Sequence, residues 1–160
     1  MKKKIGEIEL GDVAFLSDPC YGTECRGNTT INTIAGKYNV YITRSESKSI
    51  WCENRISSIM VVHKDFAPKY KKMPNDDREM LMCGVDSGTC GIFDYEYYKN
   101  FHNENDVNDE WYEKNVIEMN EFKTTDNLGC LSRSGFGDGR YPVFAEYKSE
   151  KAFAIRIKFI

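Results

Sequence analysis

The stretch that decides the fold is SRSGFGDGRYPVFAEYKSEKAFAIRIKF, residues 132–159. Two segments rich in β-branched and aromatic residues, 141–147 and 152–159, flank a short polar connection, and this pattern predicts a β-hairpin. In the second of them, apolar side chains recur at every other position, so we expect one buried face and one solvated face. The alternating apolar residues are Phe153, Ile155, Ile157 and Phe159, and the residues between them are Ala154, Arg156 and Lys158.

Three alternating glycines, Gly135, Gly137 and Gly139, precede the hairpin beside Ser134 and Asp138. Glycine adopts positive φ without a steric clash, so this segment is typical of a structured loop. Its amides favour an anion-binding nest, but a strand follows where phosphate-binding loops open a helix, and the Gly-Lys-Ser/Thr element is missing. The alternative is a tight turn in which Asp138 accepts hydrogen bonds from neighbouring amides.

Several other segments have the composition of strands. We expect strands over 5–10, 13–16, 36–44 and 56–63, two short buried strands within 81–94 that are broken at Asp86-Ser87-Gly88, and a further short strand over 50–52. Residues 22–35 are predicted to form a loop, and residues 64–79 a long exposed connection.

Two helices are expected. Asp94 is placed to cap a helix over 95–101. A longer helix is predicted from Asp109 to about Phe122, because apolar side chains recur there at helical spacing, and Asp106 or Asn108 would cap it. The predicted fold class is therefore α+β and β-dominated: a bent antiparallel sheet or sandwich with one or two packed helices, in a single domain of residues 1–160.

Composition excludes some classes of function. The net charge of −3 argues against non-specific nucleic-acid binding. No apolar run approaches the roughly 18 residues of a membrane span, and no apolar region follows the basic N-terminus as in a signal peptide. We therefore expect a soluble, cytoplasmic protein with no membrane partner.

The six cysteines contain no Cys-x-x-Cys pair. Without a secretory context we expect reduced thiols, most of them buried. A zinc site is the weaker alternative, because His63 and His102 are the only histidines and the cysteines are not closely paired. His63 is predicted to be a surface or packing residue.

Two motifs stand out, together with an early Asp18-Pro19: Val85-Asp86-Ser87-Gly88-x-x-Gly91-x-x-Asp94 and Ser134-Gly135-x-Gly137-Asp138-Gly139-x-Tyr141-Pro142-Val143. They resemble a bacterial and phage family catalogued as domain of unknown function 4241. The resemblance implies a β-rich domain and supplies no activity.

Three short acidic turns, at Asp18, Asp86 and Asp138, follow or precede predicted strands. If these ends converge, the carboxylates share one polar site suited to Ca²⁺, Mg²⁺ or acid–base work. Otherwise each aspartate caps its own turn. The candidate ligand-binding residues are Asp18, Tyr21, Asp86, Ser87, Gly88, Ser134, Gly135, Gly137, Asp138, Gly139 and Tyr141; no catalytic residue, metal or cofactor is assigned.

Two classes of function remain. The first is a small binding module for a small ligand or for a host or bacterial protein, with an inhibitor or sequestering role if the chain is phage-borne. The second is a hydrolase-type enzyme with Ser87, Ser134 or Cys20 as nucleophile and His63 or an aspartate as base. Nucleic-acid mimicry has little support because the net charge is small.

Overall fold

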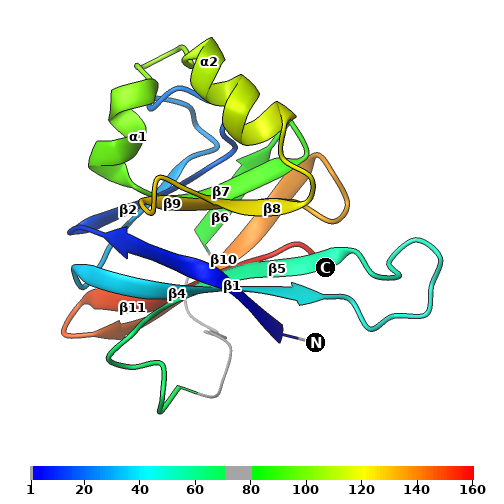
Figure 1. Cartoon of the computed structure of the whole chain (residues 1–160), viewed down its shortest axis with the longest axis horizontal. Coiled ribbons are helices and arrows are strands. Elements are labelled where there is room, and N and C mark those ends of the chain that lie inside the picture. The colour runs from blue at the N-terminus through cyan, green and yellow to red at the C-terminus, as the bar shows by residue number, and fades with distance from the viewer. Residues whose placement is uncertain (1, 71–80) are drawn as a thin grey trace.

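A computed structural model describes residues 2–70 and 81–160 (Figure 1). It contains two antiparallel sheets, which confirms the predicted β-dominated α+β fold. The six-stranded sheet has the order β1 (Lys2–Leu10), β4 (Gly36–Arg44), β5 (Ile56–His63), β11 (Lys151–Lys158), β10 (Gly139–Lys148) and β6 (Leu81–Val85). The five-stranded sheet has the order β3 (Thr29–Asn32), β2 (Val13–Ser17), β7 (Thr89–Asp94), β9 (Gly129–Arg133) and β8 (Phe122–Thr125).

The main hydrophobic core lies between the two sheets. Ile8 and Val40 enter it from the six-stranded sheet, and Leu16 and Ile92 enter it from the five-stranded sheet. Each of these aliphatic side chains is at most 2% exposed, so each contributes about 1.5–3 kcal/mol through burial. The sheets therefore depend on one another for stability.

The helices cover the outer face of the five-stranded sheet (Figure 1). They are α1 (Tyr95–Phe101), α2 (Asp109–Tyr112) and the π-helix η1 (Glu113–Ile117). Tyr98 and Trp111 pack there against Phe15 and Phe93 of the sheet. Asp94 caps α1 by accepting a hydrogen bond from the amide of Tyr97, as predicted.

The predicted helix from Asp109 to Phe122 is wrong in length and in type. It widens into a π-turn at Glu113 and ends at Ile117, and Phe122 begins β8. The buried amide of Asn115 donates to the carbonyl of Trp111 at 2.9 Å, an acceptor that the α-helical backbone would otherwise use. This competition explains the local widening of the helix.

The expectation of one solvated face on β11 is also wrong. Ala154 and Arg156, expected in solvent, are buried. The segment that follows β5 covers this outer face, and the ring of Phe66 stacks on Phe153 with centroids 4.5 Å apart. A bulge in the pairing with β10, between Glu146 and Tyr147, moves Phe153 onto this face. The rest of the predicted 64–79 connection, residues 71–79, lies outside the described residues.

Two loop predictions need correction. The predicted loop of residues 22–35 contains β3, which pairs with β2. The predicted strand over 50–52 is a turn at the tip of the β4–β5 connection. Ile50 and Trp51 there are 80% and 70% exposed.

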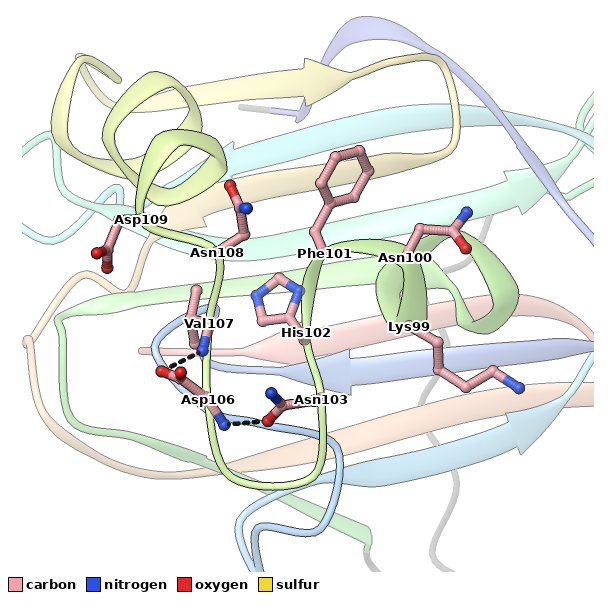
Figure 2. A pocket seen from close by; sticks show the side chains of 9 residues that line it. All are labelled: Lys99, Asn100, Phe101, His102, Asn103, Asp106, Val107, Asn108 and Asp109. Carbon is pink, nitrogen blue, oxygen red and sulfur yellow. Dashed lines mark hydrogen bonds between the residues drawn. The ribbon is translucent and has the colours of Figure 1, made fainter.

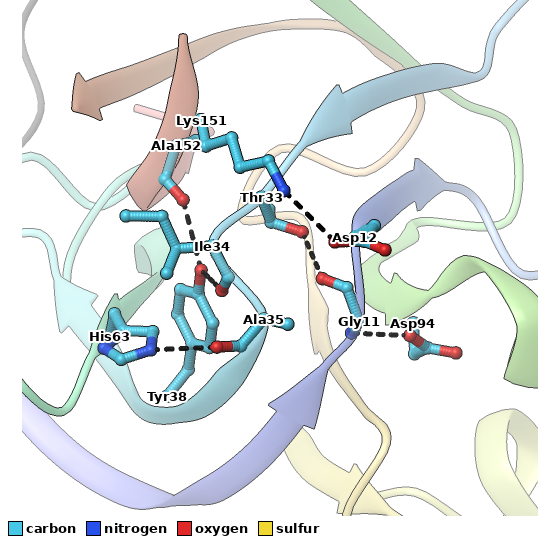
Figure 3. A network of polar contacts seen from close by, with 10 residues as sticks. All are labelled: Gly11, Asp12, Thr33, Ile34, Ala35, Tyr38, His63, Asp94, Lys151 and Ala152. Carbon is cyan, nitrogen blue, oxygen red and sulfur yellow. Dashed lines mark hydrogen bonds and ion pairs between the residues drawn. The ribbon is translucent and has the colours of Figure 1, made fainter. Parts of the chain in front are cut away.

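A polar network joins the turns at one end of the sandwich (Figure 3). Thr33 donates to the carbonyl of Gly11 at 2.7 Å, and the hydroxyl of Tyr38 lies 2.6 Å from the carbonyl of Ile34. The second carboxylate oxygen of Asp94 accepts from the amide of Gly11 at 2.8 Å. The N-terminal cap of α1 is thereby tied to the β1–β2 turn.

His63 packs in this region, as predicted, with its ring edge-on to Tyr38 and Phe66.

All six cysteines are free: Cys83, Cys90 and Cys130 are buried, and the other three are partly exposed. None of the helices within residues 2–70 and 81–160 is long and apolar enough to cross a membrane.

Candidate functional site

Asp18 follows β2 and organises the turn between β6 and β7. One of its carboxylate oxygens accepts from the amide of Cys20 at 2.8 Å and from the hydroxyl of Ser87 at 2.7 Å. The other accepts from the amides of Asp86 and Ser87 at 2.8 and 2.6 Å. The side chain is fully buried, so these four protein donors replace water around it. We call this arrangement the Asp18 clamp.

The clamp presents the side chain of Asp86 to solvent, where it accepts a hydrogen bond from the hydroxyl of Tyr21. Burial, and then the neighbouring Asp86 carboxylate, raise the pKa of Tyr21, so the phenol keeps its proton. The backbone of Tyr21 is itself held, because its carbonyl accepts from the hydroxyl of Tyr98 at 2.7 Å. A buried residue of α1 thus supports the Tyr21–Asp86 pair.

The glycine loop packs beside this turn. The amide of Ser134 donates to the carbonyl of Gly88 at 3.0 Å. The hydroxyls of Ser134 and Tyr141 both donate to the carbonyl of Gly137, at 2.5 and 2.9 Å. Gly135 has φ of +61°, and a Cβ there would clash with the carbonyl oxygen of Ile56, which explains the glycine. The amide of Ser134 and these hydroxyls are thus directed at carbonyls within the protein.

The structure brings the three acidic turns into one region but gives each aspartate a different role. Asp18 is buried and acts on the backbone, Asp86 is exposed beside Tyr21, and Asp138 is exposed on the glycine loop. Within the described part of the chain, no group of three or more His, Cys, Asp or Glu side chains is arranged to hold a metal ion.

A hollow of about 230 Å³ opens beside the clamp. It is lined by Cys20, Asn105, Asp106, Val107, Asp109 and Tyr112. The hydroxyl of Tyr112 interacts with Ser87, and burial raises the pKa of this phenol. Half of the lining, namely Asn105, Asp106 and Val107, belongs to the α1–α2 connector, residues 102–108, for which the sequence predicted no site. No spacing or motif in the connector indicates a hollow.

A larger hollow of about 430 Å³ adjoins it (Figure 2). Asp106, Val107 and Asp109 line both. The ring of His102 lies at the larger one, with its nitrogens 3.1 Å from the carbonyl of Tyr98 and 3.2 Å from that of Pro19. His102 therefore connects the end of α1 to the Asp18-Pro19 segment that forms the clamp.

The nucleophiles named by the hydrolase hypothesis have no histidine base beside them. The hydroxyl of Ser87 donates to Asp18, and that of Ser134 donates to a backbone carbonyl. Burial, then Asp18 and Asp86, raise the pKa of the Cys20 thiol, which disfavours the reactive thiolate. The ring of His63 contacts Tyr38 and Phe66 instead of any of these groups.

Fold and site together define a two-sheet α+β protein with a helical layer and with polar hollows beside an aspartate-held turn. The chain belongs to the family described as Protein of unknown function (DUF4241), whose model matches residues 15–155. This match confirms the resemblance noted in the sequence and spans every candidate residue. No curated protein and no solved structure matches the chain.

Proposed function

We propose that this protein is a binding module that takes a small polar ligand in the two adjoining hollows beside the Asp18 clamp. The observation that carries the proposal is the clamp itself. Removing a carboxylate from water costs several kcal/mol unless good hydrogen bonds compensate. Asp18 accepts four such hydrogen bonds, and they fix the surface turn between β6 and β7. Polar loops held rigidly on a β-scaffold are typical of binding sites.

The lining points to a ligand that donates hydrogen bonds or carries positive charge. Asp106 and Asp109, both exposed, line both hollows. Among the described residues that line the hollows, the one cation is Lys99, which is paired with Glu96 at 2.7 Å. Together the two hollows reach the size of small-molecule sites, roughly 300–1,000 Å³. Small amines, such as polyamines and amino sugars, are therefore the first ligand class to test.

The test is a thermal-shift screen of small amines against neutral analogues of the same size. A ligand present at about 100 times its Kd adds about 2.7 kcal/mol, which raises the Tm by roughly 5–10 °C for a chain of this length. Asp106→Asn keeps the hydrogen bond that Asp106 accepts from the amide of Val107 but removes the charge, and it should abolish most of the shift.

Asp65→Asn is the matched control, because Asp65 is also exposed but follows β5 and is not among the residues that line the two hollows. It should leave the ligand-induced shift unchanged. Equal loss in both variants, or no shift with any amine, would count against the proposed ligand class.

A host or bacterial protein partner is the second candidate. The observation that favours it is the exposure of Ile50 and Trp51 on a connection that projects from the sandwich (Figure 1). Large exposed apolar side chains often mark protein contacts, and tryptophan is enriched among residues that dominate binding energy. A phage or bacterial accessory protein with an inhibitor or sequestering role would fit this surface. The hydrolase alternative, which allowed a histidine or an aspartate as base, has less support. Asp18 accepts from the hydroxyl of Ser87, but this carboxylate is fully buried and is also held by three backbone amides.

A further inference from the structure

Two buried cysteines stand at the two ends of the Asp86–Gly88 turn. Cys83 lies in β6 and Cys90 in β7, and their sulfur atoms are 2.9 Å apart. Both side chains are fully buried in the main core. Because β6 belongs to the six-stranded sheet and β7 to the five-stranded sheet, this thiol pair spans the interface between the sheets.

We propose that Cys83 and Cys90 form a redox-modification site, at which a small peroxide converts the two thiols into a disulfide that joins the sheets across the turn. A disulfide bond is about 2.05 Å long, so the sulfur atoms need to approach by less than about 1 Å. The fold has therefore already brought the two thiols together.

The chemistry is balanced with hydrogen peroxide as the oxidant. One thiol loses its proton and attacks a peroxide oxygen, the O–O bond breaks, and a sulfenic acid and water form. The second sulfur then attacks the sulfenic sulfur and displaces its hydroxyl group, which leaves as water with the second thiol proton. Two thiols and one peroxide thus give one disulfide and two waters.

Burial makes the Cys83–Cys90 pair selective for small oxidants. A fully enclosed site admits a small peroxide on local opening more readily than a bulky disulfide reagent, so we expect oxidation by peroxide to be slow but specific. Cys130 provides an internal comparison: it is also fully buried in the main core, and its thiol donates weakly to the carbonyl of Ile92 at 3.7 Å. Burial raises the pKa of both Cys90 and Cys130. Cys90 therefore differs from Cys130 in having a second thiol, that of Cys83, beside it.

The disulfide would close residues 83–90 into a ring that contains Asp86 and Ser87, the residues held by the Asp18 clamp. A short ring of this kind restricts the unfolded chain and stabilises the folded one. The expected effect is a rise in Tm of roughly 5–10 °C, reversed by a reducing agent. The modification does not depend on the proposed ligand.

The experiment treats the full chain with hydrogen peroxide, alkylates the remaining thiols in denaturant, and maps tryptic peptides without reduction. Cys83 and Cys90 fall in the same tryptic peptide, residues 79–99. We expect this peptide to be lighter by two hydrogen atoms and free of alkylation, apart from separately resolved methionine oxidation, while Cys130 is alkylated.

Two alanine variants complete the test. Cys90→Ala should abolish both the mass change and the reversible Tm increase, and Cys130→Ala should retain both. If Cys90→Ala does not fold, the wild-type peptide map still decides. Alkylation of both cysteines after peroxide treatment, their conversion to sulfinic acids, or a disulfide between either of them and Cys20, Cys25 or Cys52 would overturn the proposal.

Discussion

At the scale of single residues, Asp18 and Asp138 show how differently two turn aspartates are used. The sequence placed both beside strand ends. Asp18 is fully enclosed and accepts four hydrogen bonds, whereas the side chain of Asp138 is exposed. Local composition does not distinguish the two, because burial depends on which distant segment covers the side chain. Two of the three amides that Asp18 binds, those of Asp86 and Ser87, lie far along the chain.

Asp18→Asn should therefore destabilise the protein by about 3 kcal/mol. The amide group of asparagine replaces one acceptor oxygen with a donor, so buried N–H groups lose charge-assisted hydrogen bonds worth about 1.5–3 kcal/mol each. Urea denaturation measures the change as a lower midpoint with an unchanged slope. The matched variant Asp138→Asn should stay within about 0.5 kcal/mol of the wild type. Equal effects of the two substitutions would contradict the assigned role of Asp18.

At the scale of elements, local patterns predicted the regular pieces well. The strands Gly36–Arg44 and Ile56–His63 and the helix Tyr95–Phe101 have the expected bounds, because alternation and a capping aspartate act within a few residues. The second helix was mispredicted because the side chain of Asn115 accepts a hydrogen bond from Thr125, in β8, at 2.8 Å. The contact with Thr125 buries the amide of Asn115, which also donates to the backbone carbonyl of Trp111. The helical spacing of apolar residues does not indicate this contact.

His102, the C-terminal cap of α1, gives this element a pH dependence. Burial lowers the pKa of His102 below its usual 6.5, and the carbonyls of Pro19 and Tyr98 oppose this effect. The folded state then binds the proton less tightly than the unfolded state. The contribution of neutral His102 to the stability of the folded state is complete above about pH 6.5 and is lost as the pH falls below that value.

His102→Gln should remove this contribution. Between pH 7.5 and 5.5 the wild type should lose up to about 1.4 kcal/mol more stability than the variant, since one pKa unit corresponds to about 1.36 kcal/mol. Denaturant titrations of both proteins at the two pH values measure the difference, in which the carboxylate titrations common to both cancel. A steeper loss of stability in the variant than in the wild type would show that the assigned sign is wrong.

At the scale of the whole molecule, both sheets share the main hydrophobic core. The helices pack on the other face of the five-stranded sheet. This arrangement predicts that the sheets and the helical layer unfold together. The protein contains two tryptophans, of which Trp111 is 4% exposed under the helices and Trp51 is 70% exposed.

In a Trp51→Phe variant, the fluorescence of Trp111 alone reports on the helical layer. Its unfolding transition in urea should coincide with the transition of the sheets followed by far-UV circular dichroism, at the same midpoint and slope. Because Trp51 is exposed, the substitution should change stability by no more than about 0.5 kcal/mol. An earlier transition of the Trp111 signal would mean that the helices detach before the sandwich unfolds.

The sequence by itself determined the β-dominated class, most strand positions, the cap of α1 and the family, because alternation, turn chemistry and motifs are local properties of the chain. Only the tertiary structure decided that β6 and β7, consecutive in sequence, belong to different sheets. It also decided that Asp18 is buried beneath the turn between them, and that the α1–α2 connector forms the hollows beside that turn. These features arise from contacts between segments that are tens of residues apart, so the free energy that selects them depends on long-range packing.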